Sequence, residues 1–170
     1  MKVRGKTFLN PYQLLIIFKK SVLLPFKTII LGRIIAFDVG KKKVGIATTD
    51  NAQIIANGLT TLKVAEVLPF LMEYMKSEEV EGFVVGLAKQ ADGTDSESMT
   101  YITPFAKSLK NRFPHIPISW VDERYTSQMA FQTMIDAGLK KMARRDKELV
   151  DKISATIILQ SYLENRRLGH

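Results

Sequence analysis

The sequence contains no cysteine, and of its two histidines one is the last residue of the chain. Without cysteine the protein can form no disulfide, no cysteine nucleophile and no thiolate-based zinc or iron–sulfur centre. Two histidines, His115 and His170, are too few for a histidine-rich metal site. Prolines are also few, six in 170 residues, and the hydrophobic content is 46%. This composition excludes wholesale disorder and suits a single domain with a core of its own.

Long hydrophobic runs are absent as well. The N-terminal region has two apolar stretches, Leu14–Phe18 and Val22–Phe26, which Lys19 and Lys20 separate. A membrane-spanning helix needs about 20 consecutive apolar residues, and neither stretch approaches that length. A signal peptide would place small residues at a cleavage site after the apolar run, and none follows. We therefore expect a cytoplasmic protein without a membrane partner.

Positive charge is plentiful, but it is unevenly distributed. The net charge is +8, from 25 basic and 17 acidic residues. Residues 1–31 contain six of the basic residues and no acidic one, whereas residues 32–170 contain 19 basic and 17 acidic residues. Net charge alone therefore does not indicate nucleic-acid binding by the domain. We predict that residues 1–31 are a basic N-terminal extension outside the core and that residues 32–170 form the folded domain.

The hydrophobic pattern of residues 32–170 alternates between short apolar runs and helical spacing. Three hairpin-like strands come first, and helices then alternate with two more strands before two final helices. The expected strands cover residues 34–37, 44–49, 57–62, 82–86 and 116–121, and the expected helices cover residues 64–75, 99–113, 126–137 and 149–165. This order predicts an α/β fold with a mixed five-stranded sheet, three antiparallel strands followed by two parallel ones, flanked by helices.

Acidic residues follow two of the expected strands and begin the last helix. Asp38 ends the first strand, Asp122 and Glu123 end the fifth, and Asp151 lies in the first helical turn. Each has an ordinary explanation. Asp38 could stabilise a turn, and Asp122 and Glu123 could form a loop ion pair with Arg124. Asp151 could interact favourably with the helix dipole. However, open α/β sheets place their sites at the carboxyl ends of strands. Taken together, these acids predict a catalytic site.

Carboxylates gathered at one point repel each other unless a cation neutralises them. Mg²⁺ suits such a site because it takes oxygen ligands and keeps water molecules for substrate phosphates, and Mn²⁺ is the alternative. Two ions about 4 Å apart can activate water and stabilise the leaving oxygen in phosphodiester hydrolysis. We expect Asp38 and Asp151 to bind metal, with Asp122 or Glu123 as the third ligand.

Basic residues flank the predicted acidic site on both sides in the sequence. Lys41, Lys42 and Lys43 follow Asp38 directly. A second group precedes Asp151 and consists of Lys140, Lys141, Arg144, Arg145 and Lys147. Charge runs usually cover a solvated surface. Their position beside the acids favours phosphate contacts instead, which would weaken as salt increases. Arg124 is a further candidate, either for phosphate or for an ion pair within the acidic group, and Tyr125 is a candidate for stacking on a base.

Four ordered blocks carry a resemblance to a known family. They read GRIIAFDVGKKKVGIATTD, VVGLAKQADGT, VDERYTSQMA and ELVDKISATIILQSYLE. Their order and spacing over residues 32 to about 165 resemble those of the bacterial YqgF-type proteins, also called RuvX. The chain departs from the family pattern at Val39, where an aromatic residue is usual, and at Ala88, where proline is usual.

This resemblance implies an RNase H-like fold and a cytoplasmic nuclease that matures the 5′ end of pre-16S rRNA, acting on that RNA or on pre-ribosomal particles. It also implies that Asp38, Asp122–Glu123–Arg124 and Asp151 occupy the active-site positions. Two alternatives remain: a Holliday junction resolvase acting on DNA, and a non-catalytic nucleic-acid-binding assembly factor. Leu31-Gly32-Arg33 stands where family members begin with Met-Gly-Arg, so we hypothesise that residues 1–30 are translated from upstream of the original start. The sequence indicates no oligomeric interface.

Overall fold

The computed structural model describes residues 32–87, 96–122, 126–141 and 145–169, and the predicted extension 1–31 lies outside these residues. The described residues form five strands and four helices. The strands are β1 (Arg33–Val39), β2 (Lys43–Thr49), β3 (Ala56–Lys63), β4 (Val80–Leu87) and β5 (Ile118–Asp122). The helices are α2 (Val64–Tyr74), α3 (Met99–Arg112), α4 (Thr126–Asp136) and α5 (Lys147–Leu168).

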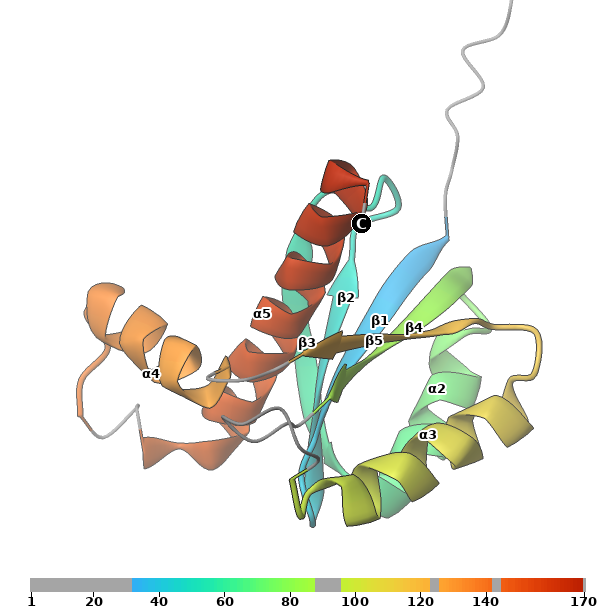
Figure 1. Ribbon diagram of the computed structural model, residues 1–170, viewed down its shortest axis with the longest axis horizontal. Helices are drawn as coiled ribbons and strands as arrows, with labels where there is room; N and C mark the ends of the chain where they lie inside the picture. Colours follow the sequence, from blue (N-terminus) through green and yellow to red (C-terminus); the bar gives the residue numbers. More distant parts are fainter. Residues whose placement is uncertain (1–31, 88–95, 123–125, 142–144, 170) are drawn as a thin grey trace, which may run out of the picture. The chain divides into compact units, whose positions relative to one another are not determined.

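The five strands form one mixed sheet in the order β3-β2-β1-β4-β5 (Figure 1). β1 and β2 pair antiparallel, as do β2 and β3, whereas β4 pairs parallel with β1 and β5 pairs parallel with β4. The prediction of three antiparallel strands followed by two parallel ones is therefore confirmed. The carboxyl ends of β1, β4 and β5 point toward the same edge of the sheet, as parallel strands must.

Helices cover both faces of the sheet, with α2 and α3 on one side and α5 on the other (Figure 1). Residues of β1 alternate between the two sides. Ile35, Phe37 and Val39 pack in the core under α2 and α3, whereas Ile34 and Ala36 pack under α5. This alternation is the period of an extended strand, and both faces of β1 are apolar because both are covered.

Aromatic rings fill the core on the side of α2 and α3. Phe37 lies 5.6 Å from Phe83 and 5.4 Å from Phe105, measured between ring centroids, and both pairs meet edge to face. Phe83 meets Phe113 in the same manner at 5.6 Å. Such pairs contribute about 0.5–1.5 kcal/mol each beyond the area that they bury. Phe37 therefore fixes α3 and the end of β1 to one another, directly before Asp38.

Two helices contain an internal proline. α2 runs through Pro69, and α3 runs through Pro104. Pro69 and Pro104 are both exposed, so the carbonyl that each proline leaves without an intrahelical donor can bind water.

No helix in the described part of the chain is long and apolar enough to cross a bilayer.

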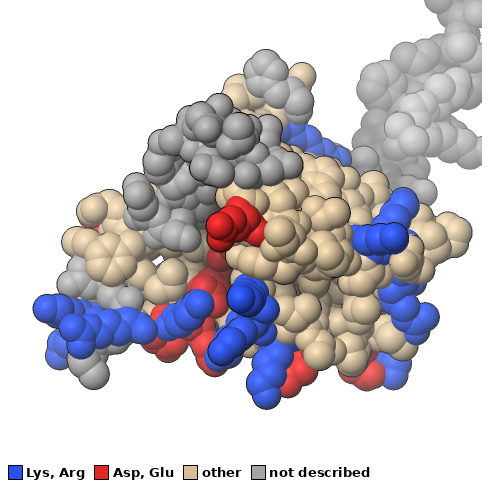
Figure 2. All heavy atoms as spheres, turned by 60° about the horizontal axis from the view of Figure 1, so that its bottom comes forward, with Lys and Arg blue, Asp and Glu red and all other residues tan. Residues whose placement is uncertain are grey.

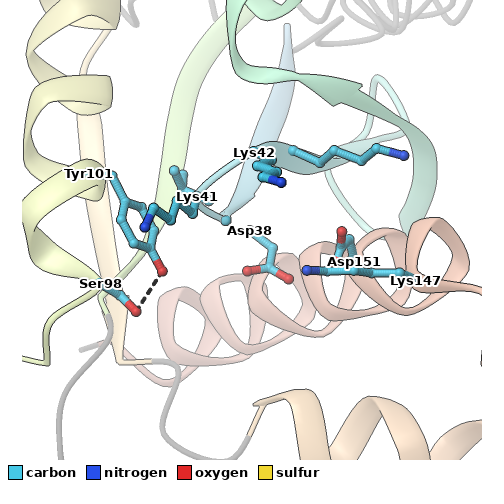
Figure 3. Close-up of a pocket in the computed structure, with 10 residues that line it drawn as sticks. Asp38, Lys41, Lys42, Ser98, Tyr101, Lys147 and Asp151 are labelled. Atoms are coloured by element: carbon cyan, nitrogen blue, oxygen red, sulfur yellow. Dashed lines mark hydrogen bonds between the residues drawn. The ribbon is translucent and has the colours of Figure 1, made fainter.

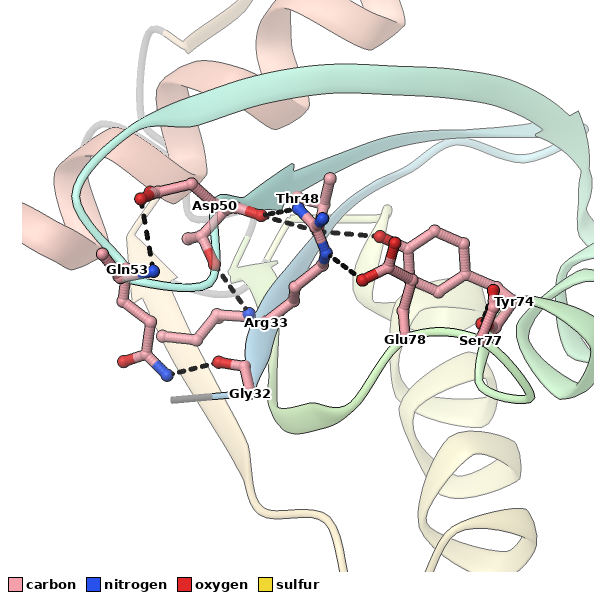
Figure 4. Close-up of polar contacts among 11 residues, drawn as sticks. Gly32, Arg33, Thr48, Asp50, Gln53, Tyr74, Ser77 and Glu78 are labelled. Atoms are coloured by element: carbon pink, nitrogen blue, oxygen red, sulfur yellow. Dashed lines mark hydrogen bonds and ion pairs between the residues drawn. The ribbon is translucent and has the colours of Figure 1, made fainter. Parts of the chain in front are cut away.

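Polar contacts gather around the start of β1, at the end of the sheet away from Asp38 (Figure 4), and one of them reaches the end of α5. Arg33 donates to the Glu78 carboxylate at 2.6 Å and to the Thr49 carbonyl at 2.7 Å. Gln53 donates to the Gly32 carbonyl at 2.6 Å and accepts a hydrogen bond from Arg166. The orientation of α5 on the sheet is therefore held at its C-terminal end by side chains from separate segments.

Candidate active site

Asp38 continues the set of β1 residues that face α5. The residues two and four positions before it, Ala36 and Ile34, pack against that helix, so the alternation places the Asp38 side chain on the same face. In Figure 3 its carboxylate points toward α5, where Asp151 and Lys147 lie. Asp38 is half-buried, as is Asp151. Two acids distant in sequence are thus brought together between a strand end and a helix start.

A glycine on β2 allows this approach. Gly45 pairs with Asp38 in the β1–β2 register. A Cβ atom added to Gly45 would lie 2.0 Å from the carbonyl oxygen of Asp151. The backbone of α5 therefore rests directly on the strand at this point. Only a residue without a side chain can stand there, because real Cβ atoms do not approach backbone atoms so closely.

The two acids line one pocket of about 620 Å³ at this edge of the sheet (Figure 3). The turn after β1 supplies Lys41 and Lys42, and α5 adds Lys147. Ser98 and Tyr101, from the start of α3, form the opposite wall, and the Tyr101 hydroxyl donates to Ser98 Oγ at 2.7 Å. The pocket thus combines two carboxylates with several cations.

Burial raises the pKa of both acids, and repulsion by Asp151 adds to the effect at Asp38. The pKa of Asp38 rises to about 7, first because the carboxylate is desolvated and second because Asp151 lies nearby, while Ser154 and Lys147 act in the opposite direction. Desolvation also raises the pKa of Asp151, against the opposing effects of Lys147 and Lys43. A bound divalent cation would remove this repulsion and favour both carboxylates in their charged form.

Ser154 is a further polar residue near Asp38. It is 1% exposed, and its Oγ makes no hydrogen bond of ordinary geometry within the described part of the chain. A weaker hydrogen-bonding interaction with Asp38 nevertheless lowers the pKa of that carboxyl. Lys147, Asp151 and Ser154 are spaced by four and three residues, so one stripe of α5 carries all of them. Buried hydroxyls usually make a full hydrogen bond, so Ser154 could also bind a ligand that enters beside Asp38.

The lysines around the pocket differ in what they contact. Lys43 forms an ion pair with Glu148, whose backbone carbonyl accepts a hydrogen bond from Thr61 at 2.8 Å. Lys41 and Lys42 are exposed at the mouth of the pocket. Figure 2 brings this end of the molecule forward and shows acidic side chains near the middle of the face with lysine and arginine side chains beside them. A polyanion could therefore reach the acids through a cationic rim.

Of the remaining predicted site residues, the four that the structure describes do not line this pocket. Asp122 is exposed at the end of β5, where it pairs with Leu87 of β4. It lies on the same sheet edge as Asp38, but two strands away. Among the described residues, no three His, Cys, Asp or Glu side chains gather closely enough to hold a metal ion. Exposed residues outside the pocket lining are Lys140, Lys141 and Arg145. The predicted residues Glu123, Arg124 and Arg144 lie outside the described residues.

The structure also adds residues that the sequence did not single out as site residues. Tyr101 is the aromatic residue of the pocket, whereas the predicted Tyr125 lies outside the described residues. Lys147, which the sequence placed in the basic group before Asp151, belongs to α5, because Asp146 caps that helix by accepting from the backbone amide of Glu148 at 3.0 Å. Ser154 was not singled out, although its spacing relative to Asp151 could have found it. Nothing in the sequence near Tyr101 indicates that it would face Asp38.

The donor atoms present fit a hard divalent cation. Asp38 and Asp151 offer carboxylate oxygens on one pocket wall, and Ser154 adds a buried hydroxyl without a partner in the described structure. Oxygen ligands of this kind suit Mg²⁺ or Mn²⁺, and such ions usually keep several water molecules beside one or two carboxylates. Two protein carboxylates are therefore a chemically sufficient start for such a site.

Comparisons with known proteins agree on one family. A family model described as RuvX, Holliday junction resolvase, matches residues 32–165. A Bacteroides fragilis protein is 55% identical over 138 residues, which cover 81% of this chain and all of that protein. A Porphyromonas gingivalis protein is 55% identical over 135 residues, which cover 79% of this chain and 98% of that protein. A Flavobacterium psychrophilum protein is 52% identical over 136 residues, which cover 80% of this chain and 99% of that protein. All three carry the provisional name pre-16S rRNA nuclease.

Among solved structures, T. thermophilus RuvC in complex with a Holliday junction substrate has a similar fold. The TM-score is 0.50 at 18% sequence identity, and the match covers 81% of this chain and 96% of RuvC. At this identity the similarity concerns the fold. RuvC is RNase H-like, so the predicted fold class is confirmed.

Proposed function

Since the chain belongs to the RuvX family, we propose that it is a metal-dependent nuclease that hydrolyses phosphodiester bonds, acting in the cytoplasm on the 5′ end of pre-16S rRNA. One observation carries the proposal: Asp38 and Asp151, from a strand end and a helix start, line one pocket with a lysine rim. The names of the relatives support the choice of substrate. Free pre-16S rRNA and pre-ribosomal particles are both candidate partners.

Asp38 and Asp151 would hold the ion, Mg²⁺ or Mn²⁺. When bound, the ion would activate a water molecule and stabilise the leaving oxygen. A third ligand would come from the end of β5, either Asp122 or Glu123, because β5 ends on the same sheet edge as β1. We assign the catalytic role to these four acids.

The basic residues would bind the phosphate backbone. Lys41, Lys42 and Lys43 follow β1, and Lys147 stands one helical turn before Asp151. Contacts from these lysines to phosphates on either side of the scissile bond would hold the strand against the acids. We extend this role to a second group of residues, namely Arg124, Lys140, Lys141, Arg144 and Arg145.

The proposal is tested by cleavage of a pre-16S rRNA fragment that spans the mature 5′ end. The Asp38→Asn variant removes one ligand charge and preserves the side-chain shape. We expect the wild type to cut the fragment only with Mg²⁺ or Mn²⁺ and Asp38→Asn to lose at least about 10²-fold in rate, a typical loss when charge stabilisation at the reacting group is removed. Equal rates in both proteins would overturn the metal mechanism. Binding without cleavage by the wild type would favour a non-catalytic assembly factor.

A second candidate is a Holliday junction resolvase. The description of the matching family model and the fold shared with RuvC favour it. The same carboxylates would serve, because RNA and DNA present the same phosphodiester group. A four-way DNA junction assayed beside the rRNA fragment separates the two substrates. Symmetric cuts in two strands of the junction, with no cut in the rRNA fragment, would favour the resolvase.

A further inference from the structure

A second, apolar groove lies between α2 and α3. It measures about 410 Å³, within the range of roughly 300–1,000 Å³ that is usual for small-ligand sites. Val64, Ala65 and Leu68 form its α2 side. Its α3 side is formed by Thr100, Tyr101, Pro104, Phe105 and Ser108.

The groove adjoins the acidic pocket. Tyr101 lines both of them. On the α2 side, the backbone amide of Val64, in the groove, donates to the carbonyl of Lys42, at the pocket rim, at 3.3 Å. A ligand could therefore extend from the lysines into the groove without crossing the protein surface elsewhere. Cationic and apolar surfaces placed side by side match a nucleotide, which joins a charged phosphate to a flat base.

The hydroxyl groups of the groove are already engaged. Tyr101 donates to Ser98 Oγ at 2.7 Å, Thr100 donates to the Glu97 carbonyl at 2.7 Å, and Ser108 donates to the Phe105 carbonyl at 2.7 Å. The groove thus offers apolar contact and the Tyr101 ring rather than hydrogen-bond donors. Contact of this kind accepts any base, because every base has an aromatic face.

We propose that this groove binds one unpaired nucleobase of the substrate strand, next to the phosphate that the lysine rim holds beside Asp38 and Asp151. This inference rests on the proposed nuclease function. A base within a duplex is stacked and paired, so it could enter only after leaving the helix. The strand beside the cut must therefore be single-stranded at that nucleotide, and the enzyme shows little preference for its identity.

The test measures binding, so that it remains distinct from the cleavage assay. Affinities are measured in EDTA, where the strand is not cut. The affinity of a short single-stranded oligoribonucleotide is compared with the affinities of variants that each lack the base at one position. We expect removal of the base at one position to weaken binding to the wild type by about tenfold, a stacking contribution of ordinary size. In Ala65→Leu, which narrows the groove, the complete oligonucleotide should bind about tenfold more weakly, and removal of that same base should have no further effect.

Glu73→Leu is the matched control, since Glu73 is an exposed residue of the same helix outside the groove. It should behave as the wild type does. Equal effects of base removal at every position, or an unchanged profile in Ala65→Leu, would overturn the base site. Cleavage that survives Asp38→Asn would overturn the proposed function while leaving this binding profile as it is. The two failures are therefore distinguishable.

Discussion

Gly45 and Asp151 are in backbone contact across the interface between the sheet and α5. A Cβ atom at Gly45 would lie 2.0 Å from the Asp151 carbonyl oxygen and 2.4 Å from its carbonyl carbon. Because Gly45 is also the register partner of Asp38, one glycine sets how closely the two acids of the pocket approach each other. The distance between two charged side chains is thus determined by a residue that carries no side chain.

Replacement of Gly45 by alanine should separate the acids. The added methyl group cannot fit against a backbone carbonyl, so α5 must move, and overpacking of this kind costs about 1–3 kcal/mol of unfolding free energy. We expect Gly45→Ala to lose that stability in urea unfolding and to lose most cleavage activity.

Gly82→Ala is the control for that change, because a Cβ at Gly82 meets nothing within 4 Å. Its unfolding free energy should change by less than about 1 kcal/mol, and its activity should be retained. A Gly45→Ala protein as stable and active as Gly82→Ala would contradict the role assigned to the close contact.

Replacement of Ser154 by alanine should reduce activity without reducing stability, unlike the replacement of Gly45. Its buried hydroxyl has no hydrogen-bond partner in the described structure, and such a group costs about 1–3 kcal/mol. In EDTA, Ser154→Ala should therefore match or exceed the unfolding free energy of the wild type. Metal-dependent cleavage should fall, because the variant has no hydroxyl beside Asp38.

Ser108→Ala serves as the comparison, since Ser108 donates to the Phe105 carbonyl at 2.7 Å. It should not gain stability. A loss of stability in Ser154→Ala as large as that of a broken hydrogen bond, about 1 kcal/mol, would show that the hydroxyl is already satisfied.

The exposed lysines at the pocket mouth should act through charge. Removing one lysine–phosphate interaction reduces the slope of log affinity against log salt by about 0.7 for a single strand. We expect Lys41→Ala and Lys42→Ala each to weaken RNA binding and to lower this slope, in titrations at several salt concentrations. Lys107→Ala, an exposed lysine of α3 outside the pocket, should leave both quantities unchanged. The same slope in all variants would contradict phosphate binding at the rim.

Stability at acidic pH should depend on Asp50. Its carboxylate accepts backbone hydrogen bonds from Ile54 and Ile55, both at 2.8 Å, and these bonds lower the pKa of Asp50 below its usual value. The stabilisation is therefore complete above the unfolded-state pKa of about 3.9 and is lost as the pH falls through the lower folded-state value.

Asp50→Asn should show a weaker loss of stability in that range, measured by urea unfolding between about pH 5 and about pH 2. Asp38 and Asp151 act with the opposite sign, because their pKa values are raised, and they contribute equally to both proteins. Parallel curves for the wild type and Asp50→Asn would contradict the prediction.

Much of this fold could be predicted from the sequence, because strand alternation and helical spacing are local patterns. The side of β1 on which Asp38 lies follows from the residues before it. Trp120 is 44% exposed, because β5 is an edge strand and one of its faces is only partly covered. The contact of Gly45 with Asp151 could not be predicted, since it depends on how far a helix settles onto a strand 106 positions away in sequence.

The contacts of Gln53 also have a mechanical consequence. Gln53 donates a hydrogen bond to the Gly32 carbonyl before β1 and accepts one from Arg166 near the end of α5. The start and the end of the described domain therefore both contact this one residue. A pulling force applied between Gly32 and Gly169 would load these hydrogen bonds first. Asp38 and Asp151, at the opposite end of β1 and α5, lie off that line, so the domain could bear tension at its ends while the pocket keeps its shape.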